Sequence, residues 1–170
     1  MSMKTLYLLR HGKSSWEQQD LRDFERPLAE RGLSDISIMG ERFVANGNSV
    51  ECIITSPAVR AKSTAILFAR EVGFPEDDVC ANPELYFAGA PMFMKAVSLI
   101  DEVFESAMLV GHNPAITEFV NDLCDADIDN IPTTGLVKLA LPITSWSQVR
   151  YGNAELVDFD YPKRKQQTGS

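Results

Sequence analysis

Long hydrophobic runs, paired cysteines and histidines are all scarce in this chain of 170 residues. No apolar stretch approaches the roughly 20 residues that a membrane-spanning helix needs, and Leu6–Leu9 is too short for the core of a secretory signal. The three cysteines, Cys52, Cys80 and Cys124, lie far apart without a CxxC pair, which argues against a disulfide framework or a cysteine-bound metal. We therefore expect a cytoplasmic protein with reduced, buried thiols and no membrane association.

A surplus of basic residues is also missing. The chain carries 24 acidic and 16 basic residues, for a net charge of −8, and this excludes a general nucleic-acid-binding role, which relies on a broad basic surface. An anionic substrate is compatible with the charge, because a few focused arginines reverse the potential inside one cleft.

Motifs of several other enzyme classes are absent. No cysteine has an arginine six positions later, so the cysteine-phosphatase loop is excluded, and no DxDxT, GxSxG, HExxH or GxxxxGK[ST] motif occurs. Asp125, Asp127 and Asp129 resemble the opening of a calcium loop, but Asn130 takes the sixth position, which needs glycine, and Leu136 the twelfth. We interpret this segment as a solvated acidic loop and predict no metal site.

Strand-like runs alternate with helical patterns along the chain. In the first helical pattern, Ile36, Met39 and Phe43 share one face. Such alternation predicts a sheet that is covered by helices on both faces. Two final strands have no helix between them, which indicates an antiparallel edge. The predicted strands are Thr5–Leu9, Cys52–Thr55, Met108–Val110, Val137–Leu141 and Glu155–Phe159, with a weaker one at Val79–Ala81.

The length favours one domain with a single substantial core. We predict a single-domain three-layer α/β/α sandwich, with a mostly parallel sheet and an antiparallel edge strand, over residues 1–160. A polar, frayed tail follows over residues 161–170. Its three adjacent basic residues, Lys163 to Lys165, are weak evidence of a partner.

The only two histidines each follow a predicted strand. Arg10 and His11 end the first strand, His112 follows the run Met108–Val110, and Arg60 follows a third apolar run. Because ligands bind at the carboxyl ends of strands in open α/β sheets, we expect these four side chains to converge on one crevice. Two arginines and two histidines there would bind a phosphoryl group.

Two of these strand ends carry residues that favour a helix start. Ser56-Pro57 predicts a helix with serine at the N-cap and proline at the first position, and Asn113-Pro114 repeats the pattern. Free N–H groups at helix N-termini suit a phosphate. Arg60 would lie on the first turn, and Gly12 would allow a close backbone approach.

The spacing of these residues resembles a known family. Arg10-His11-Gly12 after a hydrophobic strand is typical of the histidine phosphatase superfamily, which includes phosphoglycerate mutases and acid phosphatases. Ser56-Pro57-x-x-Arg60-Ala61-x-x-Thr64-Ala65 and Gly111-His112-Asn113-Pro114 resemble its second and third motifs, in the same order. Arg26-Pro27-Leu28-x-x-x-Gly32 and Ile131-Pro132-Thr133-Thr134-Gly135 resemble a narrower branch, the small SixA-type phosphohistidine phosphatases. The resemblance covers nearly the whole chain.

The resemblance implies a role for each residue of the crevice. His11 would be the nucleophile and become phosphohistidine, while Arg10, Arg60 and His112 hold the phosphoryl oxygens. A protonated His112 would add a third positive group. Neither a metal nor another cofactor is required.

Two further residues are open to two interpretations. Glu84, in Asn82-Pro83-Glu84-Leu85, is the candidate general acid, but a plain surface carboxylate is the alternative. Arg26 would cap the phosphate pocket, or else pair with Asp23 or Glu30.

Three functions fit this sequence. The first is a phosphatase for phosphohistidine on a protein, and the second is a mutase or phosphatase for a small phosphate ester. The chain is short for the insertions that enclose a small substrate. The third is a non-catalytic binder of phosphorylated ligands, which would not need the nucleophile His11.

Overall fold

Six strands form one sheet in the order β3-β2-β4-β1-β5-β6. The computed structural model describes residues 3–87 and 89–165. Strands β3, β2, β4 and β1 run parallel to one another, β5 runs antiparallel to β1, and β6 runs antiparallel to β5. The strands are β1 Lys4–Arg10, β2 Ile53–Thr55, β3 Cys80–Ala81, β4 Ser106–Gly111, β5 Leu136–Leu141 and β6 Glu155–Asp160. All six predicted strands are confirmed, including the final antiparallel pair.

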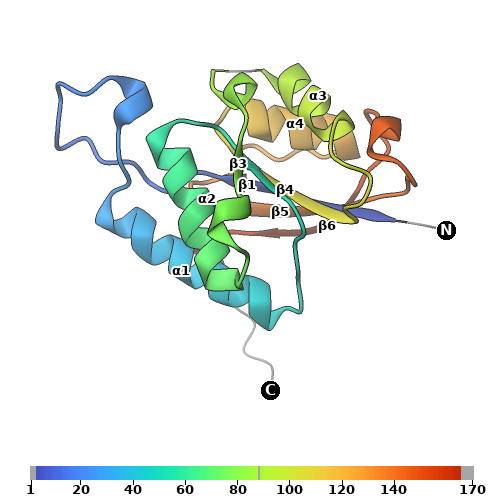
Figure 1. Cartoon of the computed structure of the whole chain (residues 1–170), viewed down its shortest axis with the longest axis horizontal. Coiled ribbons are helices and arrows are strands. Elements are labelled where there is room, and N and C mark those ends of the chain that lie inside the picture. The colour runs from blue at the N-terminus through green and yellow to red at the C-terminus, as the bar shows by residue number, and fades with distance from the viewer. Residues whose placement is uncertain (1–2, 88, 166–170) are drawn as a thin grey trace.

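Within the described residues, four α-helices cover the sheet, two on each face (Figure 1). Helices α1 (Glu30–Ala45) and α2 (Val59–Val72) pack on one face, and α3 (Ala90–Ser98) and α4 (Ala115–Cys124) on the other. The predicted single-domain α/β/α sandwich is thereby confirmed. Four short 3-10 helices lie in the connections: η1 Asp23–Glu25, η2 Glu76–Asp78, η3 Pro83–Leu85 and η4 Trp146–Gln148.

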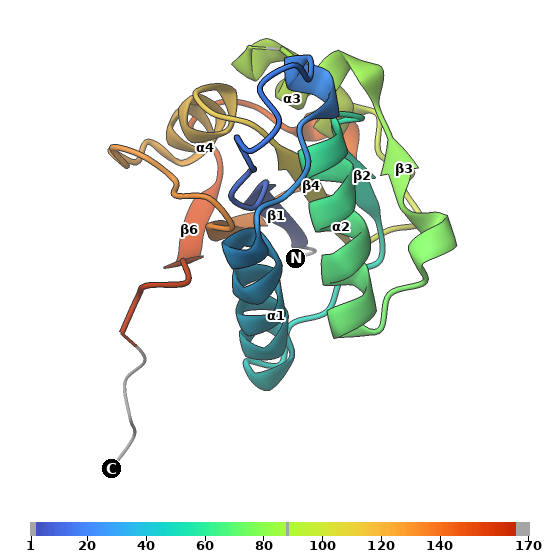
Figure 2. The same ribbon diagram turned by 90° about the vertical axis from the view of Figure 1, so that its left-hand side faces the viewer.

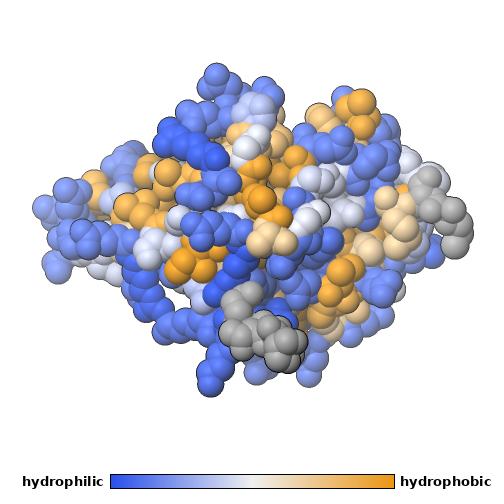
Figure 3. Space-filling model, turned by 90° about the horizontal axis from the view of Figure 1, so that it is seen from below, coloured by the Kyte–Doolittle hydropathy of each residue, from blue (hydrophilic) through white to orange (hydrophobic). Residues whose placement is uncertain are grey.

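Alternation along β1 divides the hydrophobic core into two layers. Leu6 and Leu8 face α3 and α4, whereas Tyr7 and Leu9 face α1 and α2. Because both faces are covered, β1 is a continuous apolar run rather than an alternating one. On the outer side of α1 and α2, hydrophilic residues predominate around smaller hydrophobic areas (Figure 3).

Some local predictions are wrong. Helix α2 begins at Val59 rather than at Pro57, because the Ser56 hydroxyl accepts the Ala58 N–H at 3.3 Å and holds a turn before the helix. Helix α4 begins at Ala115, and the Asn113 side chain accepts from the Thr117 hydroxyl instead of a backbone N–H.

The thiols are also less buried than predicted. All three cysteines are free, as expected, but Cys80 is exposed on the short strand β3, and Cys52 and Cys124 are half-buried. No helix within the described residues is long and apolar enough to cross a membrane.

The start of the predicted tail packs against the domain. Arg42 on α1 forms an ion pair with Asp160 at 3.3 Å and donates hydrogen bonds to the carbonyl oxygens of Tyr161 and Pro162 at 3.0 and 3.1 Å. Residues 161–162 are consequently half-buried. Residues 163–165 are exposed, and residues 166–170 of the predicted frayed tail lie outside the described residues.

Candidate active site

Parallel pairing of β1 with β4 brings the two histidines together. Arg10 lies opposite Gly111 in the register, and the His11 N–H donates to the Gly111 carbonyl at 3.0 Å. Each histidine is therefore at the carboxyl end of its strand, on adjacent strands. Their ring centroids are 5.0 Å apart.

The hydrogen bond of His11 determines which ring nitrogen is free. Nδ1 lies 2.7 Å from the Gly12 carbonyl oxygen, and because that oxygen can only accept, Nδ1 carries the hydrogen and Nε2 keeps its lone pair. Burial, together with the positive charges of Arg60, Arg10 and Arg26, lowers the pKa of His11 from 6.5 to about 4. At neutral pH His11 is therefore an uncharged imidazole with a free nucleophilic nitrogen.

His112 is neutral as well. Its Nε2 lies 2.7 Å from the Ser56 hydroxyl, so the end of β2 contributes to the site through Ser56. Burial, together with His11 and Arg60, lowers the pKa of His112 from 6.5 to about 3. The prediction of a protonated His112 is wrong, because burial and neighbouring cations disfavour the charged ring.

Arg10 and Arg60 both lie against this strand edge. The Arg10 guanidinium donates from Nη1 to the Ile131 carbonyl at 2.9 Å. Arg60 is 7% exposed, and the Thr64 hydroxyl on the next turn of α2 accepts from Gly12 N–H at 2.9 Å. Thr64 thus ties the loop after His11 to the helix that carries Arg60.

Asp23 is a site residue that the sequence analysis considered only as a partner of Arg26. Its backbone carbonyl and its carboxylate accept from Arg60 at 2.7 and 2.9 Å, and the carboxylate also accepts from Tyr86 Oη at 2.8 Å. Burial raises the pKa of Asp23, but the hydrogen bonds from Tyr86 and Arg60 and the neighbouring arginines outweigh it, so the net pKa is lowered. Asp23 is thereby held as a carboxylate that fixes the Arg60 fork.

Arg26 lies in the segment between β1 and α1, which projects beyond the sheet (Figures 1 and 2). It pairs with Asp23 at 3.4 Å, as one of its two interpretations expected, and its positive charge also lowers the pKa of His11. Its guanidinium lies 3.2 Å from the ring centroid of Trp16, which is 70% exposed. Arg26 is therefore at the rim of the site, fixed by a carboxylate and an aromatic ring.

Three buried side-chain atoms of the described residues have no hydrogen-bond partner, and all three belong to this region. They are Arg10 Nε, His112 Nδ1 and Thr134 Oγ1. The Thr134 N–H donates to the carbonyl oxygens of both Arg10 and His11 at 3.1 Å, which places Thr134 beside the nucleophile. An unpartnered buried polar atom costs about 1–3 kcal/mol, so a ligand rich in oxygen would relieve this cost.

Glu84 does not join the cluster through any contact of the described residues. It lies in η3, is about half exposed, and its carboxylate pairs with Lys95 on α3 at 3.1 Å. Its neighbour Tyr86 is the residue of this segment that approaches the site, with its ring centroid 5.8 Å from that of His112. The role of Glu84 as an acid stays a prediction.

The sequence and the fold of this chain are similar to those of known proteins. The sequence profile of the histidine phosphatase superfamily (branch 1) matches residues 6–85. An uncharacterized protein of Picosynechococcus sp. is 32% identical over 121 residues, which cover 67% of this chain and 69% of the relative.

The chain belongs to the histidine phosphatase superfamily. Within it the SixA-type branch is the match, because the SixA protein of Agrobacterium tumefaciens, assigned as a phosphohistidine phosphatase, superposes with a TM-score of 0.80 at 27% identity, over 94% of this chain and 98% of that one. A 2,3-bisphosphoglycerate-dependent phosphoglycerate mutase of Chlamydia felis is 37% identical over 67 residues, which cover 38% of this chain and 29% of the mutase. The superfamily supports phosphatase activity through histidine.

Titration of the two histidines tests this electrostatic description. Since the chain has only two histidines, their Cε1–H protons give two NMR resonances, and we expect midpoints of about 4 for His11 and about 3 for His112. Because the folded pKa values are depressed, the unfolded chain takes up protons below about pH 6.5 that the folded chain does not. The free energy of unfolding therefore falls as the pH drops from 6.5 toward 4. A midpoint near 6.5 for either ring in the folded protein would contradict the burial of an uncharged pair.

Proposed function

We propose that this protein is a phosphatase that works through a phosphohistidine intermediate on His11 and acts on phosphohistidine of a protein substrate. The observation that carries the proposal is the neutral His11 ring, with its Nε2 free, next to three unpartnered buried polar atoms on Arg10, His112 and Thr134. A tetrahedral phosphoryl group offers several acceptor oxygens to such donors.

The chemistry follows in two steps. The lone pair of His11 Nε2 attacks phosphorus, the bond from phosphorus to the leaving group breaks, and the leaving group takes the electron pair and a proton from solvent. Water then attacks the phosphoryl group on His11 and gives a proton back to solvent, the electron pair of the P–N bond returns to Nε2, and inorganic phosphate is released. Charge on the transferring oxygens needs fixed donors, which Arg10 and Arg60 supply.

Asp23 contributes to this proposal by orienting Arg60. Both terminal nitrogens of Arg60 donate to Asp23, so Asp23 orients the guanidinium. An arginine that is held in this way loses less rotational freedom on binding a phosphate. We infer that Asp23 and Tyr86 position Arg60 rather than touch the phosphoryl group.

Two features support a protein substrate: the reactivity of a phosphohistidine leaving group and the short connection between α3 and β4. Glu84 pairs with Lys95, and a phosphohistidine needs little help from an acid because it is already a high-energy donor. Small substrates gain from enclosure that excludes water, and this chain has no long insertion for a lid between α3 and β4.

A phosphatase or mutase for small phosphate esters is the second candidate. The partial match to the phosphoglycerate mutase supports it. A non-catalytic binder of phosphorylated ligands is disfavoured, because its pocket would not need a nucleophilic imidazole. We also propose that the reaction needs no metal, so that turnover survives strong chelators.

Two variants of Arg60 separate charge from geometry. We expect Arg60→Ala to lower kcat by about 10²-fold, the usual cost of losing one donor to the transition state. Arg60→Lys keeps the charge but not the planar fork, so its rate should also be much reduced. Hydrolysis of an aryl phosphate measures both.

The exposed Arg70 on the same helix provides the matched control, because it pairs with Glu76 away from the site. Arg70→Lys should keep the wild-type rate. Circular dichroism confirms that each variant is folded. Near-normal turnover in folded Arg60→Ala would rule out its part in holding the phosphoryl group.

The choice of substrate is tested by kcat/KM for a phosphohistidine protein against phosphosugars and phosphoglycerates. We expect the protein to be the better substrate, and Glu84→Gln to slow alkyl phosphates far more than phosphohistidine. The protein assignment is wrong if a metabolite reaches about 10⁵ M⁻¹s⁻¹, in the range of dedicated enzymes, while the phosphoprotein is far slower.

A further inference from the structure

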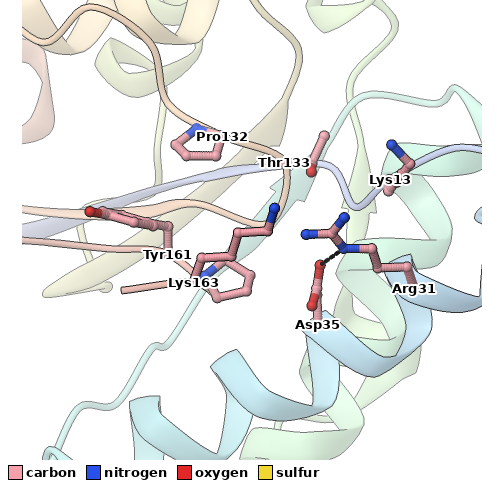
Figure 4. A pocket seen from close by; sticks show the side chains of 8 residues that line it. Lys13, Arg31, Asp35, Pro132, Thr133, Tyr161 and Lys163 are labelled. Atoms are coloured by element: carbon pink, nitrogen blue, oxygen red, sulfur yellow. Dashed lines mark ion pairs between the residues drawn. The ribbon is translucent and has the colours of Figure 1, made fainter. Parts of the chain in front are cut away.

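A pocket of about 320 Å³ lies beside the active site, on the far side of the turn that contains Thr134. Its walls come from three parts of the chain: the residue after the Gly12 loop, the first turns of α1, and the segments that flank β5 and β6. Side chains that line it include Lys13, Arg31, Asp35, Thr133, Tyr161 and Lys163 (Figure 4).

Positive charge dominates this pocket. Three of its side chains are cationic, Lys13, Arg31 and Lys163, whereas Asp35 is the single carboxylate that lines it. Arg31 pairs with Asp35 at 3.7 Å, and no ion pair among the described residues involves Lys13 or Lys163. The nitrogen ends of Arg31 and Lys163 extend into the same space (Figure 4). Lys13, Arg31 and Lys163 are all exposed, and in a chain of net charge −8 this local surplus of positive charge favours an anionic ligand.

The walls of the pocket are held in place. Arg42 bonds the carbonyl oxygens of Tyr161 and Pro162, as described above, so Lys163 follows an anchored segment. On the opposite wall, the Ala29 N–H donates to the Lys13 carbonyl at 2.8 Å. The backbone of Lys13 also lies close to Gly32. A Cβ on residue 32 would lie 2.5 Å from the Lys13 carbonyl oxygen.

Strand register gives the distance from the nucleophile. Leu9 of β1, Leu136 of β5 and Asp160 of β6 lie in one row, and adjacent strands are about 4.8 Å apart. The chain leaves β1 toward His11 and leaves β6 toward Tyr161 at this same edge. The segment that begins at Tyr161, on the far wall of the pocket, therefore leaves the sheet about 10 Å to the side of the strand end that carries His11, two strand spacings away.

We propose that this pocket is a second anion subsite, which binds a carboxylate or phosphate that the substrate carries about 10 Å from the transferred phosphoryl group. The inference rests on the proposed phosphatase activity but extends it, because it names a feature of the substrate outside the reacting centre. A neutral group would leave Lys13 and Lys163 without a counter-ion, whereas an anionic oxygen group would pair with both. The two sources of such a group are an acidic side chain near a phosphohistidine and the second phosphate of a small bisphosphate.

The test compares matched substrates on matched variants. Lys13→Gln/Lys163→Gln removes two charges from the pocket, and Arg150→Gln/Lys165→Gln removes two from exposed positions outside its lining. Both proteins have the same net charge. One substrate pair is a phosphohistidine peptide with flanking glutamates and its glutamine counterpart, and the other is an alkanediol bisphosphate and its monophosphate. An aryl phosphate reports the basal reaction.

We expect the wild type to prefer the anionic member of at least one pair. The pocket variant should lose about fivefold to tenfold in kcat/KM for that member, mainly through KM, since it lacks two ion pairs at exposed positions, and each such pair is weak. The aryl phosphate, the neutral members and the control variant should be unchanged.

The outcomes separate the subsite from the proposed function. A charge preference in the bisphosphate pair alone supports the subsite and overturns the protein substrate, and a preference in the peptide pair supports both. If neither pair shows a preference, or the control variant loses as much as the pocket variant, the subsite is overturned, while turnover of the aryl phosphate still supports the phosphatase.

Discussion

The parallel register between β1 and β4 is the constraint on which the site depends. It sets Arg10 opposite Gly111 at the two strand ends, so that a histidine directly follows each strand. Gly111 has to be glycine for a packing reason, because a Cβ there would lie 2.5 Å from the Phe93 ring. A slip of one residue would turn every side chain of β1 to the opposite face, and both the core and the histidine pair would be lost.

Burial gives the two histidines their chemical character. The hydrophobic layers on both faces of β1 and β4 remove water from the strand ends, and this keeps His11 and His112 uncharged at neutral pH. The same burial leaves polar atoms of Arg10, His112 and Thr134 without partners. The core thus stabilises a site that is unfavourable by itself and that an anionic ligand completes.

The sequence predicts the strands of this protein correctly but not the starts of two helices. Apolar runs predicted every strand because the sheet is covered on both sides, and the two histidines marked the strand ends where the site lies. The helix starts after Ser56 and Asn113 were wrong because the Ser56 hydroxyl also contacts His112 and the Asn113 amide donates to the Ile131 carbonyl, which are distant parts of the chain. A capping pattern contains no information about such competition.

The residues that position Arg60 could not be predicted from the sequence for a similar reason. Asp23 and Tyr86 are 63 positions apart, and only the fold brings both to Arg60. Thr134 lies in the segment Ile131 to Gly135, which resembles a motif of the SixA-type branch. That resemblance is the one feature of the sequence that indicates a role for Thr134. The basic pocket also combines distant parts of the chain, since Lys13 and Lys163 come from opposite ends of the sequence. Local patterns predict strand ends, whereas networks between distant loops require the structure.

The central claim is that a phosphoryl group passes through His11, and a rapid-quench experiment tests it most directly. The protein is mixed with a radiolabelled phosphorylated substrate and quenched in alkali, which preserves phosphohistidine, and the labelled peptide is sequenced. We predict one label per chain, on His11, which forms and decays at rates consistent with turnover. A label on any other residue, or turnover close to the wild-type rate in folded His11→Ala, would contradict the account.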